Sequence, residues 1–339
     1  MCGTPSQPTA TPISPPSSKA QQEVDGAARS TDDLRWPDFL VIGAQKAGTT
    51  WLWKQLRTHP QVRIPPKKEI HFFDREILSK SLHWYQQQVA DPNGTAVVRG
   101  EKTPCYAHLK ARSIRLIREL MPNVKVVLLL REPAERAWSQ ARMEISQFNK
   151  RELTVRDTMR CIFNTGLLRN RRRTDYRRIV ENWLSVFPED QVFIGFYDQI
   201  ELQPTALLQR ICSFLGVEDH STTAGSTPSD RVWKSPSMSM PRSVRWYLNR
   251  RYRRTTEWIG KRFTATPDSW SSQDACSDTC SLWEKTQVLF TADIATVPYN
   301  LLYTGYDLIR DVRLAKRIRK ARREVGLSSG ALSSHRKCP

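Results

Sequence analysis

Hydrophobic and polar positions alternate between strand-like and helix-like patterns over the first two thirds of the chain. Short apolar runs of strand length are followed by amphipathic stretches with a helical period. The predicted strands are 38–43, 96–100, 124–130 and 191–197, and the predicted helices are 49–58, 109–120, 133–148, 175–187 and 204–215. Strands that alternate with helices predict an α/β domain whose mostly parallel central sheet is covered by helices on both faces. Ligands of such sheets bind beyond the carboxyl ends of the strands.

The pattern changes at both ends of the chain. Residues 1–34 are rich in proline and serine and predict a disordered arm. The α/β domain is then expected over 35–300, and a basic helical tail over 301–339, where 301–323 has a helix-like pattern. A Ser/Thr/Pro-rich loop at 219–243 precedes a basic segment at 242–262. The pattern leaves open whether these last basic stretches pack on the core or form an appendage.

Charge and composition narrow the class of protein. The 339 residues include 53 Lys+Arg and 34 Asp+Glu, a net charge of +19. This excess favours a polyanionic partner: a nucleotide, a nucleic acid, a sulfated or carboxylated polymer, or an anionic membrane face. No apolar run approaches the roughly 20 residues of a membrane span, and no signal peptide is evident. A soluble intracellular protein, cytoplasmic rather than Golgi-lumenal, is therefore expected; the Golgi lumen is the alternative if an anchor precedes this sequence.

Cysteine usage argues against two kinds of site. Seven cysteines are too few for a disulfide scaffold. Cys276 and Cys280 form a C-x3-C pair with no second pair and no nearby histidine, so a structural zinc site is not expected.

The segment Gly43-Ala-Gln-Lys-Ala-Gly-Thr-Thr50 lies directly between a predicted strand and a predicted helix. Glycines allow successive backbone N–H groups to face an anion, and the helix N-terminus adds roughly half a positive charge. Lys46 would add a full charge, so the segment predicts a phosphate cradle. It is not a Walker A loop, because Thr49 stands where that loop has lysine. The alternative is a tight turn with an exposed lysine.

The strand 124–130 runs into Arg131 and then into a helix that carries Ser139 two turns later. An arginine at the carboxyl end of a central strand would point into the same crevice as the first loop, where its guanidinium can hold a phosphate bidentately. A P-loop NTPase would be expected to offer an aspartate for magnesium here. The alternative is a local ion pair between Arg131 and Glu135 at helical spacing.

Two further segments combine acidic, basic and imidazole side chains. In 67–74 the charged groups stand beside two phenylalanines, surroundings that can shift pKa values toward general-base work. Read alone, this segment is a surface charge cluster on an anchored loop. The segment 101–106 places a lysine at another strand end. The candidate residues are Glu69, His71, Asp74 and Lys102.

Taken together, these ordered segments resemble the sulfotransferases that use 3′-phosphoadenosine 5′-phosphosulfate (PAPS). The matching stretches are Lys-Ala-Gly-Thr-Thr at 46–50, Arg-Glu-Pro-Ala-Glu-Arg-Ala-x-Ser at 131–139, and the succession Tyr176…Trp183…Phe187-Pro188…Tyr197…Phe214-Leu215-Gly216. Glu69-x-His71-x-x-Asp74 and Glu101-Lys102-Thr103-Pro104-x-Tyr106 resemble the carbohydrate-type branch, which includes heparan sulfate 3-O-sulfotransferases and N-sulfotransferase domains. The resemblance covers about 38–217 and implies a single P-loop-like α/β domain.

The resemblance implies roles on the donor side of the site. The phosphate loop would bind the 5′-phosphosulfate through Lys46, Ala47, Gly48, Thr49 and Thr50. Within it, Lys46 would lie near the bridging oxygen. Arg131 and Ser139 would bind the 3′-phosphate. Arg231 and Lys234 are the nearest candidates for a loop that covers the nucleotide.

On the acceptor side, the resemblance implies that Glu69 is the catalytic base. His71 and Asp74 would shape the acceptor site, and Lys102 would lie near the transferred sulfuryl group. The catalytic set is therefore Glu69, Lys46, His71 and Lys102. Thr50 stands where 3-O-sulfotransferases usually carry arginine, so their regiochemistry is not transferred.

The expected function is transfer of a sulfuryl group from PAPS to a hydroxyl or amine, with a carbohydrate as the favoured acceptor and no metal. The dense run 169–173, with Arg177 and Arg178, is either a solvated face or an anionic acceptor groove. No specific nucleic-acid partner is expected, because a basic patch alone is weak support. The alternatives are a P-loop kinase or NTPase and a non-catalytic polyanion-binding protein.

Overall fold

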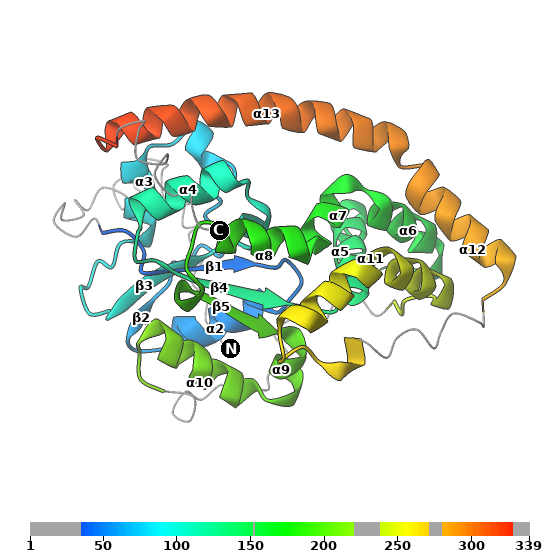
Figure 1. Ribbon diagram of the computed structural model, residues 1–339, viewed down its shortest axis with the longest axis horizontal. Coiled ribbons are helices and arrows are strands. Elements are labelled where there is room, and N and C mark those ends of the chain that lie inside the picture. Colours follow the sequence, from blue (N-terminus) through cyan, green and yellow to red (C-terminus); the bar gives the residue numbers. More distant parts are fainter. Residues whose placement is uncertain (1–34, 152, 220–237, 271–279, 328–339) are drawn as a thin grey trace, which may run out of the picture.

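The computed structural model describes residues 35–151, 153–219, 238–270 and 280–327 (Figure 1). The predicted arm at 1–34, most of the loop at 219–243, and Cys276 lie outside the described residues.

Within the described residues, five strands form one sheet, and all of them are parallel. Their order is β2-β3-β1-β4-β5. The strands are β1 (Phe39–Gly43), β2 (Val62–Arg63), β3 (Val98–Lys102), β4 (Lys125–Leu130) and β5 (Val192–Phe196). The chain first builds the sheet to one side of β1 and then, from β4, to the other side. The carboxyl end of β1 is therefore a topological switch point, where α/β sheets bind ligands.

Helices cover both faces of this sheet, as predicted. In Figure 1, α4 and α8 lie on one face and α2 and α10 on the other. The helices before residue 219 are α2 (Thr49–Thr58), α3 (Leu82–Val89), α4 (Ala111–Leu120), α5 (Pro133–Asn149), α6 (Thr158–Gly166), α7 (Leu168–Thr174), α8 (Tyr176–Leu184), α9 (Tyr197–Leu202) and α10 (Pro204–Leu215). After it come α11 (Arg242–Arg262), α12 (Leu282–Leu289), the π-helical turn η9 (Phe290–Ile294) and α13 (Val297–Glu324). Among these described helices, none is both long enough and apolar enough to cross a bilayer.

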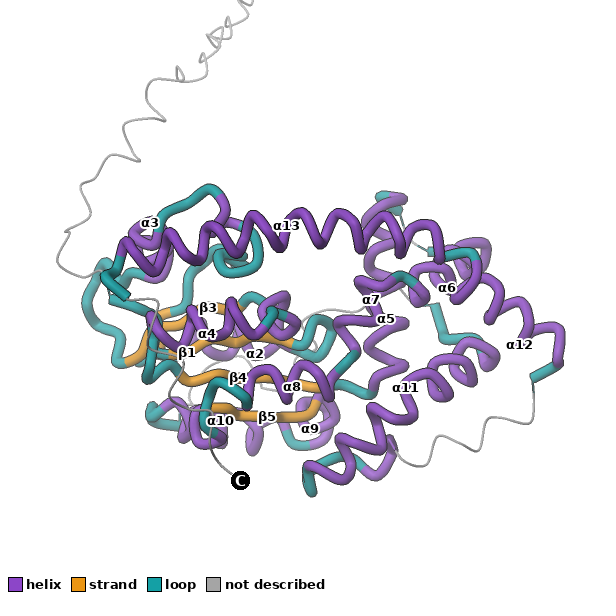
Figure 2. The backbone as a smooth tube through the Cα atoms, turned by 45° about the horizontal axis from the view of Figure 1, so that its top comes forward, coloured by secondary structure: helices purple, strands orange, loops and turns teal. Residues whose placement is uncertain are grey.

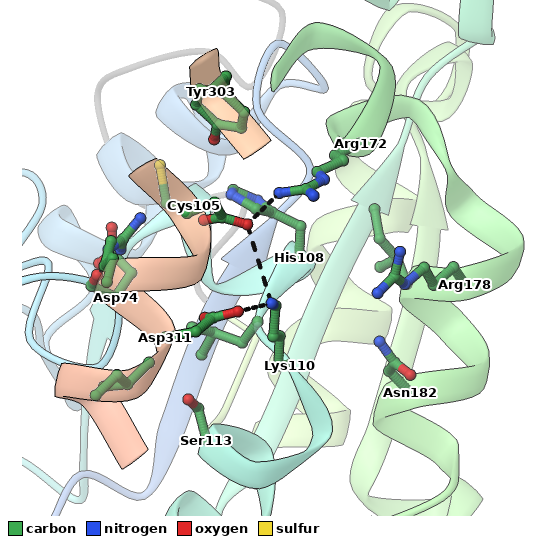
Figure 3. A pocket seen from close by; sticks show the side chains of 15 residues that line it. Asp74, Cys105, His108, Lys110, Ser113, Arg172, Arg178, Asn182, Tyr303 and Asp311 are labelled. Atoms are coloured by element: carbon green, nitrogen blue, oxygen red, sulfur yellow. Dashed lines mark hydrogen bonds and ion pairs between the residues drawn. The ribbon is translucent and has the colours of Figure 1, made fainter. Parts of the chain in front are cut away.

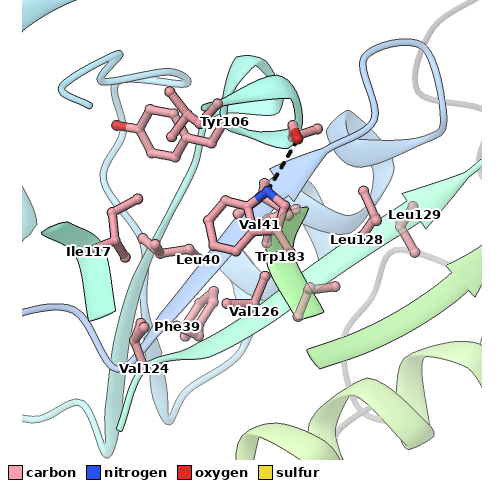
Figure 4. Close-up of a cluster of buried hydrophobic side chains, with 14 of the residues drawn as sticks. Phe39, Leu40, Val41, Tyr106, Ile117, Val124, Val126, Leu128, Leu129 and Trp183 are labelled. Atoms are coloured by element: carbon pink, nitrogen blue, oxygen red, sulfur yellow. Dashed lines mark hydrogen bonds between the residues drawn. The ribbon is translucent and has the colours of Figure 1, made fainter. Parts of the chain in front are cut away.

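The main core lies around the two central strands (Figure 4). Every residue of β1 is buried, and so is every residue of β4 after Lys125, which explains why both strands read as apolar on both faces. The indole N–H of Trp183 on α8 donates to the carbonyl of Ala107, 3.2 Å away. This bond fixes α8 against the segment that follows β3, so the two strand ends that carry candidate residues are held rigidly.

A second buried cluster joins α5, α6, α11 and α12, with Trp138, Val244 and Leu248 among its members. The basic segment at 242–262 is thus a helix whose apolar side packs on α5. The last helix also packs on the domain, because α13 buries Leu314, Ile318 and Ala321 in the main core. Figure 2 shows α13 crossing from this helical region toward α3 and α4. Both basic stretches left open above therefore pack on the core.

The boundary error that affects the site concerns β3, predicted at 96–100 and found at Val98–Lys102. Glu101 and Lys102 look like loop residues in the sequence, yet both side chains are buried. The strand accommodates them because each has partners from distant segments, which local pattern does not reveal.

Candidate active site

The loop between β1 and α2 has the backbone of an anion cradle. Gly43 and Gly48 have φ of 145° and 86°, and Lys46 has φ of 72°. A β-carbon at Gly48 would lie 2.2 Å from Ile200 Cδ1, so the loop approaches α9 too closely for a side chain there. Among the described residues, no side chain caps the start of α2, so backbone N–H groups there can donate to an anion.

Lys46 is a half-buried cation that lies among other cations. Its Nζ lies 3.7 Å from Met143 Sδ, and among the described residues no carboxylate forms an ion pair with it. Burial first, and then the nearby charges of Arg131 and Arg142, lower the pKa of Lys46 from 10.5 to about 8. A buried positive cluster of this kind is stabilised when an anion enters it.

Arg131 reaches this loop from the end of β4, as the strand order predicts. Its guanidinium donates to the carbonyl of Lys46 at 3.4 Å and lies over the ring of Tyr197, 4.4 Å from its centroid. The alternative ion pair is present as well, because Arg131 lies 3.6 Å from Glu135. Arg131 therefore belongs to the crevice while keeping its helical partner.

The remaining donor-side candidates are placed unequally. Ala47, Thr49 and Ser139 are buried, whereas Thr50 is half-buried. Ser139 lies on α5, two turns after Arg131. Its role as a phosphate ligand stays a prediction. Arg231 and Lys234 lie outside the described residues.

On the other side of β1, four candidate side chains form a hydrogen-bonded chain. Lys102 Nζ, at the end of β3, lies 2.9 Å from Glu69 Oε1. Glu69 Oε2 lies 3.1 Å from His71 Nε2, and His71 Nδ1 lies 3.0 Å from Asp74 Oδ2. His71 has φ of 59°, so its backbone holds the ring between the two carboxylates at a conformational cost. The structure thus brings together all four acceptor-side candidates.

The charges in this chain are strongly coupled. Hydrogen bonds to Asp74, Cys105 and Glu69 raise the pKa of His71 from 6.5 to about 11, so the imidazole is cationic. Burial alone would raise the pKa of Glu69, but His71 and Lys102 outweigh it and hold that pKa at about 2. Glu69 is consequently an ionised, doubly held carboxylate.

The donor and acceptor halves are neighbours. A β-carbon at Gly43 would lie 2.9 Å from the carbonyl oxygen of Pro104, so β1 ends tightly against the segment that follows Lys102. The charge of Lys68 lowers the pKa of both Lys46 and Lys102. Both groups therefore lie at the same end of the sheet, where the switch point lies.

Glu101 supports the loop that carries Glu69 and His71, a role that the sequence did not predict. Its Oε1 accepts from Tyr85 at 2.7 Å and from Tyr106 at 2.9 Å, and its Oε2 accepts from Thr103 at 2.8 Å. Thr103 in turn accepts from the backbone N–H groups of residues 70 and 71. Glu101 thus positions the loop that carries Glu69 and His71. The sequence signal that could have indicated this role is the position of Glu101 next to Lys102 in β3, because adjacent strand residues point to opposite faces of the sheet.

We expect Glu101→Gln to change how stability depends on pH. Burial raises the pKa of Glu101 from 4.5 to about 7, so the native state binds a proton that the unfolded state releases. The carboxyl's contribution to the free energy of unfolding is then largest below about pH 4.5 and falls by about 3 kcal/mol as pH rises through 7. Urea unfolding at several pH values should show this fall in the wild type and not in Glu101→Gln. Parallel pH profiles for both proteins would contradict the assignment.

A pocket lies beyond Asp74 and Cys105, beneath α13 (Figure 3). Its walls carry Lys110, Arg172 and Arg178, and α13 contributes Asp307 and Asp311. Asp307 pairs with Arg172, and Asp311 pairs with Lys110. Members of the arginine run at 169–173 therefore have acidic partners within the fold, and Arg178 faces this pocket.

Part of the acceptor-side cluster also has the side-chain types that ligate metals. Among the described residues, His71, Asp74 and Cys105 have potential ligand atoms within 4.8 Å of one another. The hydrogen bonds of His71 already account for this proximity, because they hold its ring in the cationic form that cannot ligate a metal. That the reaction needs no metal stays a prediction.

Known proteins carry the same combination of fold and motifs. A family model described as "Sulfotransferase domain" matches residues 36–250. A bifunctional heparan sulfate N-deacetylase/N-sulfotransferase 4 of Mus musculus is 29% identical over 60% of this chain and 24% of its own length. A heparan sulfate glucosamine 3-O-sulfotransferase 5 of Mus musculus is 29% identical over 53% of this chain and 54% of its own. The chain thus spans about a quarter and about half of these relatives.

Among solved structures, a sulfotransferase from Alicyclobacillus acidocaldarius has a similar fold, with a TM-score of 0.55 and 22% identity over 70% of this chain and 99% of that one. The family resemblance predicted from the motifs is confirmed, since the family model covers most of the chain and all of the candidate residues that the structure describes. This protein, with its all-parallel sheet and its cationic loop at the switch point, belongs to the sulfotransferase domain family.

Proposed function

We propose that this protein transfers the sulfuryl group of PAPS to a hydroxyl or amine, with a carbohydrate as the favoured acceptor. The observation that carries the proposal is the half-buried Lys46 ammonium, which lies among cations near an uncapped helix N-terminus and lacks a carboxylate partner in the described residues. Such a group fits the phosphosulfate of PAPS, because an anion there would offset the burial and the repulsion that lower the lysine pKa.

The arrangement supports an in-line displacement. The acceptor oxygen or nitrogen forms a bond to sulfur while the bond from sulfur to the bridging phosphate oxygen breaks, and negative charge develops on that oxygen. Lys46 and the start of α2 would stabilise the charge. The acceptor proton would pass to Glu69.

Glu69 needs a change in its surroundings to serve as the base. A carboxylate with a pKa of about 2 is a weak proton acceptor, and Lys102 and His71 keep it so. Lys102 would turn from Glu69 toward the incoming sulfuryl oxygens, since these are anionic. Losing that partner raises the proton affinity of Glu69 as the reaction begins.

The carbohydrate acceptor rests on the named relatives, which are sulfotransferases of heparan sulfate. A kinase or NTPase is disfavoured because β4 runs into Arg131 instead of an acidic magnesium ligand.

The direct test is incubation with radiolabelled PAPS and a panel of glycans, phenols and amines. Transfer to a glycan is expected, and it should continue in the presence of EDTA. ATP turnover without PAPS binding would favour the P-loop alternative. Salt-sensitive binding of nucleic acid or glycan without either activity would favour a non-catalytic binding protein.

We expect Arg131→Ala to weaken PAPS binding roughly tenfold or more, since it removes a charged donor at the mouth of the phosphate loop. Its effect should appear in KM for PAPS more than in kcat. Titration calorimetry with PAPS measures the loss directly. Arg115→Ala on α4 removes an arginine away from the crevice and should bind PAPS as the wild type does. Equal affinities for both variants would remove Arg131 from the donor site.

A further inference from the structure

The outward side of α12, η9 and α13 exposes large apolar side chains. Among those between 58% and 74% exposed are Trp283, Phe290, Ile294, Leu302, Tyr306 and Ile309. Monomeric soluble proteins rarely leave a contiguous apolar surface of this kind uncovered, and such surfaces mark interaction sites. Figure 1 shows these elements forming a continuous outer edge of the molecule.

The same face of α13 becomes basic toward its C-terminus. Leu302, Tyr306 and Ile309 follow one another at helical spacings of four and three residues. After Ile309 the stripe continues at alternating spacings of four and three residues. It then carries four exposed cations: Arg313, Lys316, Lys320 and Arg323. One stripe of the helix is therefore apolar over its first half and cationic over its second.

The acidic side chains of α13 do not offset these cations, because each of the three already pairs with another cation. Asp307 and Asp311 are directed at Arg172 and Lys110 in the pocket below. Glu324 pairs with Arg317, 2.9 Å away. On η9, Asp293 pairs with Arg171 and with Arg251. The outward charge of this edge is thus positive.

We propose that this edge docks the protein on a membrane surface that contains anionic phospholipids. The apolar half would enter the boundary between headgroups and acyl chains, where tryptophan and tyrosine are favoured. The basic half would contact the headgroups, each cation adding to the affinity. The inference is independent of the proposed transferase activity.

Other occupants match this edge less well. A second copy of α13 would bring the same outward cations, and its one exposed acid, Glu324, already pairs with Arg317. A glycan or nucleic acid would answer the cations but leave the apolar half uncovered. An anionic membrane complements both halves of the stripe.

The test is sedimentation of the full chain with vesicles of phosphatidylcholine, alone or with roughly 30% phosphatidylserine. The wild type should bind the phosphatidylserine vesicles at least tenfold more tightly, and salt should weaken that binding. The apolar variant Leu302→Gln/Tyr306→Gln/Ile309→Gln and the basic variant Arg313→Gln/Lys316→Gln/Lys320→Gln should each lose on the order of tenfold. Glutamine preserves helix propensity at these exposed positions.

The matched control is Arg250→Gln/Arg254→Gln/Lys261→Gln, which removes three exposed cations from α11. It should bind vesicles within about twofold of the wild type, and circular dichroism should show native helix content in every variant. A wild type that does not distinguish the two vesicles overturns the proposal even if a variant fails to fold. An apolar variant that binds normally but turns a dimer into a monomer in light scattering assigns the edge to a second copy instead.

Discussion

Lys46→Ala is expected to lower kcat/KM for PAPS roughly 100-fold or more, a loss of about 3 kcal/mol of transition-state stabilisation. The side chain is half-buried beside Arg131 and Arg142 just before α2, where charge on a leaving phosphate would develop. Alanine supplies no charge in its place, so the loss should appear in kcat as well as in KM. Initial rates with radiolabelled PAPS and a glycan acceptor measure it.

The pH dependence gives a second readout for the same lysine. Because the pKa of Lys46 is about 8 in the free protein, kcat/KM should fall as pH rises through 8 and the ammonium loses its proton. Lys46→Arg keeps a positive charge and should move this fall to higher pH.

The control for Lys46 lies on the same helix. Lys54→Ala removes an exposed lysine of α2 and should leave both rate and pH profile unchanged. A Lys46→Ala protein that keeps its activity within about threefold would contradict the role of this residue.

The elements that carry the donor loop were predictable because their signals are local. The apolar runs that became β1 and β4 are buried on both faces, and α2 and α10 begin and end where their patterns predict. Glycine at 48 suits a backbone with φ of 86°, and a glycine before a helix already indicates such a turn. Local pattern therefore located the loop between β1 and α2.

What the sequence could not show were the partners that distant segments provide. Lys102 can be buried in β3 because Glu69 pairs with it. Glu101 can be buried there because Tyr85 and Tyr106 donate hydrogen bonds to it. The sequence likewise could not show that the arginine run at 169–173 forms ion pairs. Its partners Glu144, Asp293 and Asp307 come close only when the helices pack together. Charge counted along a sequence does not reveal which charges are already paired in the fold.

These pairings matter most at Glu69, because they separate two roles that one carboxylate can have. As a base, it takes the acceptor proton. As a fixed anion, it only holds Lys102 at 2.9 Å and His71 at 3.1 Å. Both roles predict a loss in Glu69→Gln, so the size of the loss alone does not decide between them.

Comparing two acceptors distinguishes the base from the fixed anion. Glu69→Gln is expected to lower kcat by about 100-fold to 1000-fold on a sugar hydroxyl. Glutamine keeps the shape and one acceptor oxygen but cannot take a proton. A base is needed less by a phenol, whose hydroxyl ionises near pH 10, than by a sugar. The loss on a phenolic acceptor should therefore be at least tenfold smaller if Glu69 is the base, and equal if it only positions Lys102 and His71. Glu257→Gln, an exposed carboxylate of α11, should change neither rate. Because the pKa of Glu69 is about 2 in the free protein, the wild-type kcat/KM should show no acid limb from this residue above about pH 4.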